Sequence, residues 1–412
     1  MPPLGLTADG RVLFLTRIAR MFAYGFLAVI LALYLAALGL DGFHIGLLLT
    51  LTLVGDTVIS LWLTTNADRF GRRRVLIAGA ALMFLAGILF AVTGDFPVLV
   101  LAATIGVISP SGNEVGPFLA VEQASLSHTI PAVRRTQVFA WYNLVGMVAT
   151  ACGSLGAGLL SGLLQAGGVP AADSYRVIVI AYAAVGLSLA AGFTRLSSKV
   201  EVAPTDAHDD GIRRRLGLGR SRSIVLRLAA LFSIDAFGGG LVPQSLMAYW
   251  FHVRFGVEPG VLGAIFFAAN IAAAASALTA ARLAARIGLI NTMVFTHLPS
   301  NVLLILVPFM PTLALAVLVL LLRFSISQMD VPTRQSYTMA VVEPGERSAA
   351  AGVTGVARTT GAAVSPLISA PLIAGGLGAA TFVLAGGVKI AYDLLLYRAF
   401  RAVRPPEERP GG

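Results

Sequence analysis

Long apolar stretches, separated by short polar interruptions, recur along the whole 412-residue chain. A helix needs about 20 mostly apolar residues to cross a bilayer. We predict twelve membrane-spanning helices near residues 12–38, 44–66, 74–94, 97–126, 135–165, 174–195, 223–250, 258–282, 290–309, 312–341, 348–375 and 377–400. The predicted fold class is therefore an all-α membrane protein.

The composition excludes several other classes of protein. Charged residues make up 12% of the chain, about half the share of a soluble domain. So few charges could not cover the surface of a water-soluble enzyme or DNA-binding protein. The net charge of +10 is explained by basic residues in cytoplasmic loops, so it does not indicate binding to nucleic acid. Because the chain has one cysteine, no paired histidines and no phosphate loop, we predict no metal and no cofactor.

The basic residues predict the orientation in the membrane. With the N-terminus inside, most of the 30 lysines and arginines fall on inner segments, including Arg17 and Arg20, and the outer loops hold Arg176 and Arg254. Four more lie within predicted spans: Arg323, Arg334, Arg358 and Lys389. This bias predicts a multi-pass protein of the cell inner (plasma) membrane with both termini cytoplasmic.

Weak internal repetition divides the chain into two halves. Glu122 matches Arg334, Arg135 matches Arg347, and Asp68 to Gly71 falls opposite Ala285 to Gly288, at offsets near 212 residues. Such repeats are a feature of secondary transporters. We predict two pseudo-symmetric six-helix bundles, at residues 1–196 and 223–404, joined by a cytoplasmic linker at 197–222 and followed by a tail at 405–412.

The most specific motif is Asn66-Ala67-Asp68-Arg69-Phe70-Gly71-Arg72-Arg73-Arg74, between the second and third spans. It resembles the signature loop of the major facilitator superfamily, Gly-x-x-x-Asp-Arg-x-Gly-Arg-Arg, with Thr64 in place of the leading Gly. The resemblance implies two bundles that rock about a central site. It also implies that Asp68, Arg69, Gly71 and Arg72 latch the halves in one state. The alternative is that this loop only anchors the topology.

Resemblance to the drug-efflux branch of the family is weaker. Gly153-Ser154-Leu155-Gly156-Ala157-Gly158 is similar to the antiporter motif Gly-Pro-x-x-Gly-Gly, with Ser154 in place of the proline. Close packing of small residues between membrane helices explains the same pattern equally well.

Charges inside predicted spans are candidates for function because each costs at least about 2.5–3.5 kcal/mol at bilayer depth. Glu114 lies among Gly112, Gly116 and Pro117, which predict an irregular helix beside a cavity. We expect Glu114 to bind a proton or substrate, or alternatively to be buried against another helix. Asp56, in the second span, is interpreted as structural.

Asp235 is a second candidate proton carrier. Gly238 to Gly240 and Pro243 follow it and predict a bend in the seventh span. The alternative is a structural partner for Arg358 or Arg227. Tyr24 and Gln244 are expected to line the cavity.

The tenth span carries three charges. At about 100° per residue, Arg323, Asp330 and Arg334 would share one stripe of a continuous helix. Asp330 and Arg334 form an i,i+4 pair, which is interpreted as a self-compensated structural pair. Arg323 has no acid one turn away and is expected either to hold an anionic substrate group or to release the proton of a carboxylate by pairing with it. We also hypothesise that Glu122 and Arg334 meet to close an inner gate.

These features together predict a secondary active transporter that works by alternating access. The favoured function is efflux of a small organic solute coupled to proton entry, by a monomer in the lipid bilayer. The alternative is proton- or ion-coupled uptake of an anionic metabolite held by Arg323 and Arg358. A non-transporting sensor is a further possibility. A membrane enzyme is disfavoured because the sequence offers no nucleophile–base set.

Overall fold

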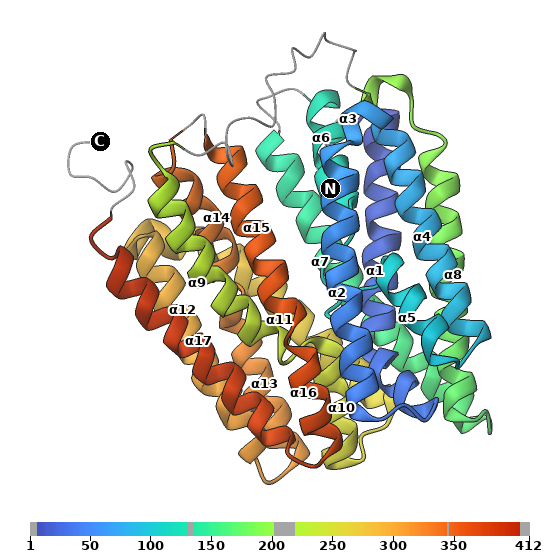
Figure 1. The fold of residues 1–412 in the computed structure, drawn as a ribbon. Coiled ribbons are helices and arrows are strands. Elements are labelled where there is room, and N and C mark those ends of the chain that lie inside the picture. Colours follow the sequence, from blue (N-terminus) through green and yellow to red (C-terminus); the bar gives the residue numbers. More distant parts are fainter. Residues whose placement is uncertain (1–5, 131–134, 202–218, 344–345, 404–412) are drawn as a thin grey trace. The chain divides into compact units, whose positions relative to one another are not determined.

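The structure is a computed structural model that describes residues 6–130, 135–201, 219–343 and 346–403. Within these ranges every regular element is a helix (Figure 1). The α-helices are α1 (Ala8–Ala37), α2 (Gly42–Thr65), α3 (Ala67–Phe70), α4 (Arg72–Val92), α5 (Phe96–Ile105), α6 (Phe118–Thr129), α7 (Arg135–Ala166), α8 (Ala171–Phe193), α9 (Arg222–Gly240), α10 (Gln244–Phe255), α11 (Pro259–Ile287), α12 (Leu289–Leu306), α13 (Leu313–Ser327), α14 (Asp330–Val341), α15 (Arg347–Ala363), α16 (Pro366–Ala374) and α17 (Gly378–Phe400). The 3-10 turns are η2 (Ser198–Val200) and η4 (Val307–Phe309). Most of the predicted linker and tail, at 202–218 and 404–412, lies outside the described residues.

Ten helical stretches in the described ranges are long and apolar enough to cross a membrane. The prediction of twelve spans is thus confirmed in part. The two predicted spans that fall short, 97–126 and 348–375, are both interrupted. The first is non-helical from 106 to 117, where Gly112 and Gly116 have φ angles of 72° and 80°. The second breaks just before Pro366, which has no N–H to continue the helical ladder.

Two further predicted spans are each built from two helices. The break between α9 and α10 falls at Leu241 to Pro243, as the glycine run and proline predicted. The break between α13 and α14 at Gln328 and Met329 was not predicted. Pro332 lies in the first turn of α14, where a missing N–H costs little. The prediction of one continuous helix over 312–341 is therefore wrong.

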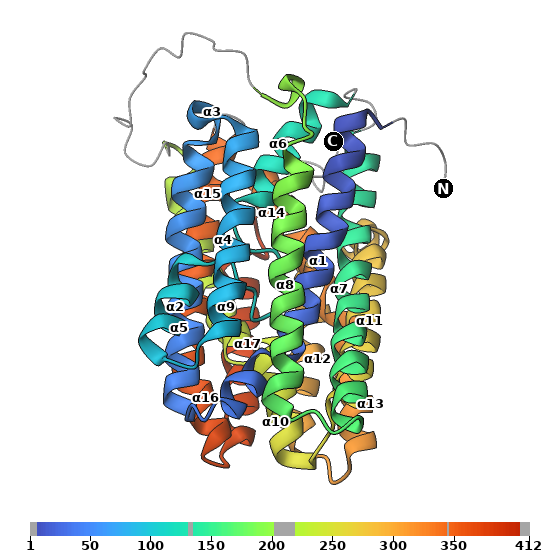
Figure 2. The same cartoon turned by 90° about the vertical axis from the view of Figure 1, so that its right-hand side faces the viewer.

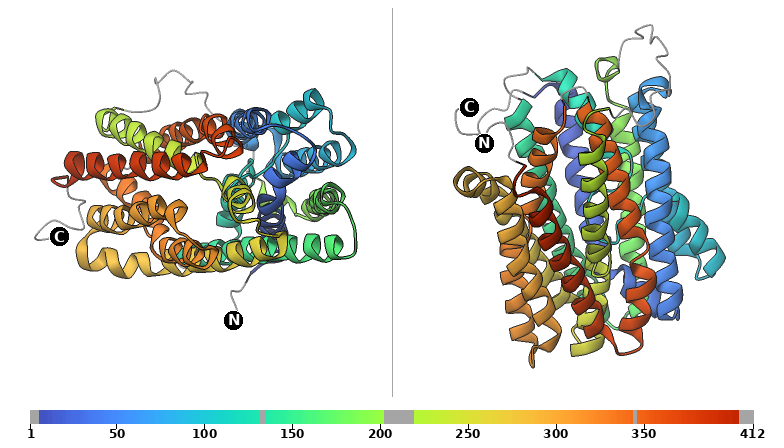
Figure 3. Two further views of the ribbon diagram at one scale, coloured as in Figure 1. Left: turned by 90° about the horizontal axis from the view of Figure 1, so that it is seen from below. Right: turned by 60° about the vertical axis from the view of Figure 1, so that its left-hand side comes forward.

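The described helices form two compact units. Unit 1 comprises Met1–Asp206 and Pro243–Phe267, and unit 2 comprises Ala207–Val242 and Ala268–Gly412. In unit 1, α1 packs against α7, α8 and α10, and α4 lies beside α8 (Figure 2). In unit 2, α9 packs against α15 and α17, and α12 packs against α17 (Figure 3).

The division into units differs from the predicted boundaries, because Pro243–Phe267 belongs to unit 1 rather than to the second bundle. Glycines explain this packing. A Cβ atom on Gly158 of α7 would lie 2.5 Å from the carbonyl oxygen of Pro259 and 2.7 Å from the Cα of Gly263. The backbones of α7 and the start of α11 therefore touch, and Ser245 N donates to the Pro110 carbonyl in the same unit.

The paired loops of the proposed repeat share one turn conformation. Gly71 precedes α4 with φ 96° and ψ 126°, and Gly288 precedes α12 with φ 85° and ψ 163°. Only glycine adopts such positive φ angles without strain. This local match agrees with the alignment of Asp68 to Gly71 with Ala285 to Gly288.

The close contact between α1 and α7 gives a first stability prediction. A Cβ atom on Gly25 would lie 2.0 Å from the Thr150 carbonyl oxygen. We expect Gly25→Ala to lower the free energy of unfolding by about 1–3 kcal/mol, because a rigid backbone cannot yield as a side chain does. Thermal unfolding of the purified protein, followed by tryptophan fluorescence, measures this.

Gly387→Ala is the matched control, since Gly387 lies inside α17 and a Cβ atom there would meet no neighbouring element within 4 Å. We expect it to be neutral or stabilising by up to about 1 kcal/mol. Equal losses in the two variants would contradict the packing argument.

Candidate functional site

A buried group of opposite charges lies in unit 1. This unit 1 cluster consists of Arg17 and Arg20 from α1, Glu114 from the non-helical segment, Glu122 from α6 and Tyr142 from α7. Arg20 Nη2 lies 2.7 Å from Glu114 Oε1, and Arg20 Nη1 lies 2.6 Å from Glu122 Oε1. Arg17 Nη1 lies 2.7 Å from Glu114 Oε2. Two cations and two anions therefore compensate one another.

Neutral groups complete the unit 1 cluster. The Tyr142 hydroxyl donates to Glu122 Oε2, and Arg17 Nε donates to the Tyr142 carbonyl over 2.8 Å. The Arg20 guanidinium lies 4.4 Å above the centre of the Phe118 ring. The Arg20 and Glu122 side chains are fully buried, whereas 15% of the Glu114 side chain stays exposed. Of the two acids, Glu114 is the more exposed.

Side chains from three helices hold the non-helical segment 106–117. Tyr24 of α1 donates its hydroxyl to the Val115 carbonyl, and Tyr182 of α8 donates to the Val107 carbonyl. Asp56 of α2 accepts the Gly116 N–H over 2.7 Å. Backbone groups freed from a helix inside a membrane need such partners. The irregular helix predicted around Glu114 is thus present. Tyr24 of α1 is buried against it and holds it through the hydrogen bond to Val115.

A second group of buried charges lies in unit 2. This unit 2 cluster is centred on Asp235 of α9 and includes Asp330, Arg334, Arg358 and Lys389. Asp235 lies 2.6 Å from Lys389 Nζ, 3.0 Å from Arg334 Nη1 and 3.2 Å from Arg358 Nη1. Arg334 also pairs with Asp330 over 2.9 Å, which confirms the i,i+4 pair. Arg358, but not Arg227, is the partner of Asp235.

Exposure differs within the unit 2 cluster. The Arg358 side chain is 34% exposed, while that of Asp235 is 4% exposed and that of Arg334 is 8% exposed. Arg358 is therefore the most exposed member of the unit 2 cluster.

A polar triad borders the unit 2 cluster. His297 Nδ1 lies 2.9 Å from Asp393 Oδ1, and Asn301 donates to Asp393 Oδ2 over 2.9 Å. The other ring nitrogen of His297 lies 3.8 Å from Asp235.

This triad and the role of Lys389 were not predicted from the sequence. His297 lies inside α12, and Lys389 lies inside α17. The i,i+4 spacing of polar residues in these spans could have pointed to both features. His297 and Asn301 share one face of α12, and Lys389 and Asp393 share one face of α17.

The arginines of α1 correct another prediction. Arg17 and Arg20 were counted as cytoplasmic anchors, yet they are 5% and 0% exposed and paired with acids. A count of basic residues by position alone cannot see partners that lie 94 to 102 residues away along the chain.

Arg323 does not share a charged stripe with Asp330 and Arg334. The break at residues 328–329 ends the helical register that the prediction assumed. The Arg323 guanidinium lies 4.8 Å from the centre of the Phe324 ring, and no ion pair joins it to another described residue. Its Nε is buried without a hydrogen-bond partner in the described ranges.

The predicted gate residues find partners within their own units. Glu122 is bound by Arg20 in unit 1, and Arg334 is bound by Asp235 and Asp330 in unit 2. A gate between Glu122 and Arg334 stays a prediction. Gln244, expected in the cavity, is buried in unit 1 and donates to Ser154 Oγ over 3.1 Å.

The predicted latch loop binds a carboxylate within unit 1. The backbone N–H groups of Arg72 and Arg73 donate to Glu201 over 2.7 and 3.1 Å. A carboxylate is favoured at a helix N-terminus. Arg69 is exposed, and the Asp68 side chain lies outside the described residues. The latch itself stays a prediction.

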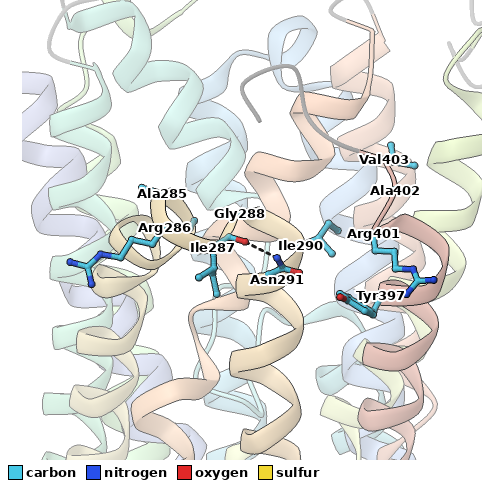
Figure 4. A pocket seen from close by; sticks show the side chains of 11 residues that line it. Ala285, Arg286, Ile287, Gly288, Ile290, Asn291, Tyr397, Arg401, Ala402 and Val403 are labelled. Carbon is cyan, nitrogen blue, oxygen red and sulfur yellow. Dashed lines mark hydrogen bonds between the residues drawn. The ribbon is translucent and has the colours of Figure 1, made fainter. Parts of the chain in front are cut away.

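A pocket of about 730 Å³ lies elsewhere in unit 2 (Figure 4). It surrounds the turn at Gly288 and the end of α17, with Arg286 and Arg401 on its flanks. No member of the unit 2 cluster lines it. The two charge clusters, rather than this pocket, are therefore the candidate sites.

The fold and the buried charge clusters define a multi-pass membrane protein. Residues 13–366 match the sequence profile described as Major Facilitator Superfamily. The chain is 30% identical to an uncharacterized membrane protein of Saccharomyces cerevisiae, over 96% of this chain and 94% of that protein. A shorter match, 32% identical, covers 25% of this chain and 27% of the quinolone resistance protein NorA of Staphylococcus aureus.

A solved structure of the nucleoside transporter NupG superposes with a TM-score of 0.75 at 14% identity, over 95% of this chain and 99% of that one. At this identity the likeness concerns the fold. The chain belongs to the major facilitator superfamily, and it is a transporter of small solutes rather than an enzyme.

Proposed function

We propose that this protein exports a small organic solute in exchange for protons across the cell inner membrane, as a monomer with both termini in the cytoplasm. The observation that supports this most is the pair of buried charge clusters, one in each unit. Each has a single partly exposed charged member, Glu114 or Arg358. The partial likeness to NorA, a quinolone resistance protein, favours export.

Breaking ion pairs is the proposed coupling step. Ionised Glu114 holds Arg17 and Arg20 by charge-assisted hydrogen bonds. A proton on Glu114 removes its charge and weakens both bonds, which frees the arginines to change partners. The same logic applies to Asp235, whose charge holds Lys389, Arg334 and Arg358. Each proton would thereby favour the state in which the charges are rearranged.

The second candidate function is uptake of an organic anion. Partial exposure of Arg358 favours it, because an incoming carboxylate could share the guanidinium with Asp235. The identity of the solute and the direction of coupling separate the two functions.

Transport by purified protein tests the proposal. In proteoliposomes with an imposed pH gradient, we expect solutes drawn from a panel of quinolones, nucleosides and organic anions to drive proton flux. Glu114→Gln should reduce that flux to the level of empty liposomes, because a neutral amide cannot release its arginines by protonation. Asp95→Asn, an exposed change before α5, is the control and should keep the flux.

If an organic anion is the transported solute and protons cross the membrane in the same direction as that anion, uptake is favoured over export. Solute transport that leaves the pH inside the liposomes unchanged, whichever way the pH gradient is imposed, would contradict proton coupling.

A further inference from the structure

Asp56 of α2 is a buried carboxylate that neither charge cluster uses. It is 9% exposed and lies near the middle of its helix. Its Oδ1 accepts two hydrogen bonds, from the Ser60 hydroxyl over 3.0 Å and from the Gly116 N–H over 2.7 Å. No lysine, arginine or histidine forms an ion pair with it among the described residues.

This environment differs from that of the other buried acids in the predicted spans. Glu114, Glu122, Asp235 and Asp330 each lie within 3.0 Å of an arginine or lysine, and Asp393 lies 2.9 Å from His297. Asp56 instead has as its titratable neighbours Glu114 on the non-helical segment, Tyr24 on α1 and Tyr182 on α8. None of these carries a positive charge. A buried anion without a counter-ion is costly, and the protonated acid avoids that cost.

Asp56 also lies where α2 meets the chain that leads into the non-helical segment. A Cβ atom on its neighbour Gly55 would lie 1.8 Å from the carbonyl oxygen of Thr104, in the last turn of α5. This close approach fixes the Asp56 backbone against the start of the segment. The carboxylate then reaches the other end of the segment at Gly116.

The bond to Gly116 links Asp56 to the unit 1 cluster. Gly116 follows Glu114 by two residues, in a turn with φ 80°. The ionised carboxylate binds the Gly116 N–H by a charge-assisted hydrogen bond, and protonation weakens that bond. A weaker hold on Gly116 lets the turn shift, and Glu114 moves with it relative to Arg17 and Arg20.

We propose that Asp56 is a proton-binding site whose occupancy is conveyed to the unit 1 cluster through the backbone from Gly116 to Glu114. The proton adds to a carboxylate oxygen of Asp56 and turns an acceptor-only group into a donor. This inference rests on the proposed proton-coupled transport for its purpose, but the binding event itself does not require transport.

Infrared difference spectroscopy of the purified protein in lipid, titrated with pH, tests the site directly. We expect the carbonyl stretch of a protonated carboxyl group to appear on acidification. The component of that band that comes from Asp56 should be absent in Asp56→Asn and retained in the control Asp95→Asn, so the band should be smaller in Asp56→Asn than in the wild-type protein. Retention of the full band in a folded Asp56→Asn protein would overturn the proposal.

Isotope labelling keeps the test valid if Asp56→Asn does not fold. Aspartate labelled at its side-chain carboxyl carbon should shift the component assigned to Asp56 in the wild-type protein, and labelled glutamate should leave that component in place. A band that shifts only with labelled glutamate would also overturn the proposal.

Hydrogen exchange checks the link to the cluster. After correction for the intrinsic effect of pH, the peptide containing Gly116 should exchange faster at low pH in the wild-type protein and show no pH effect in Asp56→Asn. An equal pH effect in both would contradict the link.

Transport then separates this inference from the proposed function. We expect Asp56→Asn to exchange solute but to give no solute-driven proton flux. If wild-type protein shows the titrating band but no proton flux, the proposed coupling fails while the proton site stands. If the flux is intact in Asp56→Asn, a role for Asp56 in coupling fails while the proposed proton-coupled transport stands.

Discussion

Replacing Arg20 by methionine is expected to lower the free energy of unfolding by about 3–5 kcal/mol, because it leaves buried carboxylates without their shared cation. Arg20 is fully buried and bridges Glu114 and Glu122, and Glu122 has no other cationic partner among the described residues. Methionine keeps most of the side-chain volume, so the loss reflects charge rather than a cavity. Thermal unfolding monitored by size-exclusion chromatography of the heated protein measures the effect.

The second-site variants make this prediction specific. Arg20→Met combined with Glu122→Gln removes one charge of each sign and leaves the Arg17–Glu114 pair intact. We expect this double variant to regain most of the lost stability. Arg20→Met with Glu114→Gln should regain less, because Arg17 and Glu122 would then both be unpaired. Arg11→Met, an exposed change on the same helix, should lie within about 0.5 kcal/mol of wild type.

An equal result for the two double variants would contradict the pairing. So would a stability loss in Arg20→Met no larger than that in Arg11→Met.

Local sequence patterns predicted the features that depend on neighbouring residues. Apolar length located the helices, the Gly112 to Pro117 run predicted the break in the fourth span, and i,i+4 spacing predicted the Asp330–Arg334 pair. Each of these follows from backbone freedom or helix geometry within one or a few turns.

Features that depend on distant residues could not be predicted in this way. Arg20 and Glu114 are 94 residues apart, and Asp235 and Lys389 are 154 residues apart. A basic residue near the start of a span looks the same in the sequence whether it faces lipid headgroups or a buried acid. Only the packing of α1 against the non-helical segment and α6 separates the two. The same reasoning explains why Asp56 could be interpreted as structural from the sequence.

Asp235→Asn is the second change with a large expected effect. It removes the acid shared by Lys389, Arg334 and Arg358, and three cations then face Asp330 and the His297–Asp393 pair. We expect a loss of about 3–5 kcal/mol in the free energy of unfolding and solute transport at the level of empty liposomes. Asp173→Asn, which breaks an exposed pair on α8, should leave both unchanged.

The double variant Asp235→Asn, Lys389→Met separates charge balance from proton binding. It removes one charge of each sign and so returns the cluster to the net charge of the wild type, and we expect it to regain most of the stability. If Asp235 binds a coupling proton, solute transport in the double variant should still fail to drive proton flux, since the carboxylate is absent. Recovery of both stability and flux would mean that Asp235 serves only to neutralise its neighbours. The proton pathway would then lie in unit 1, through Glu114 and Asp56.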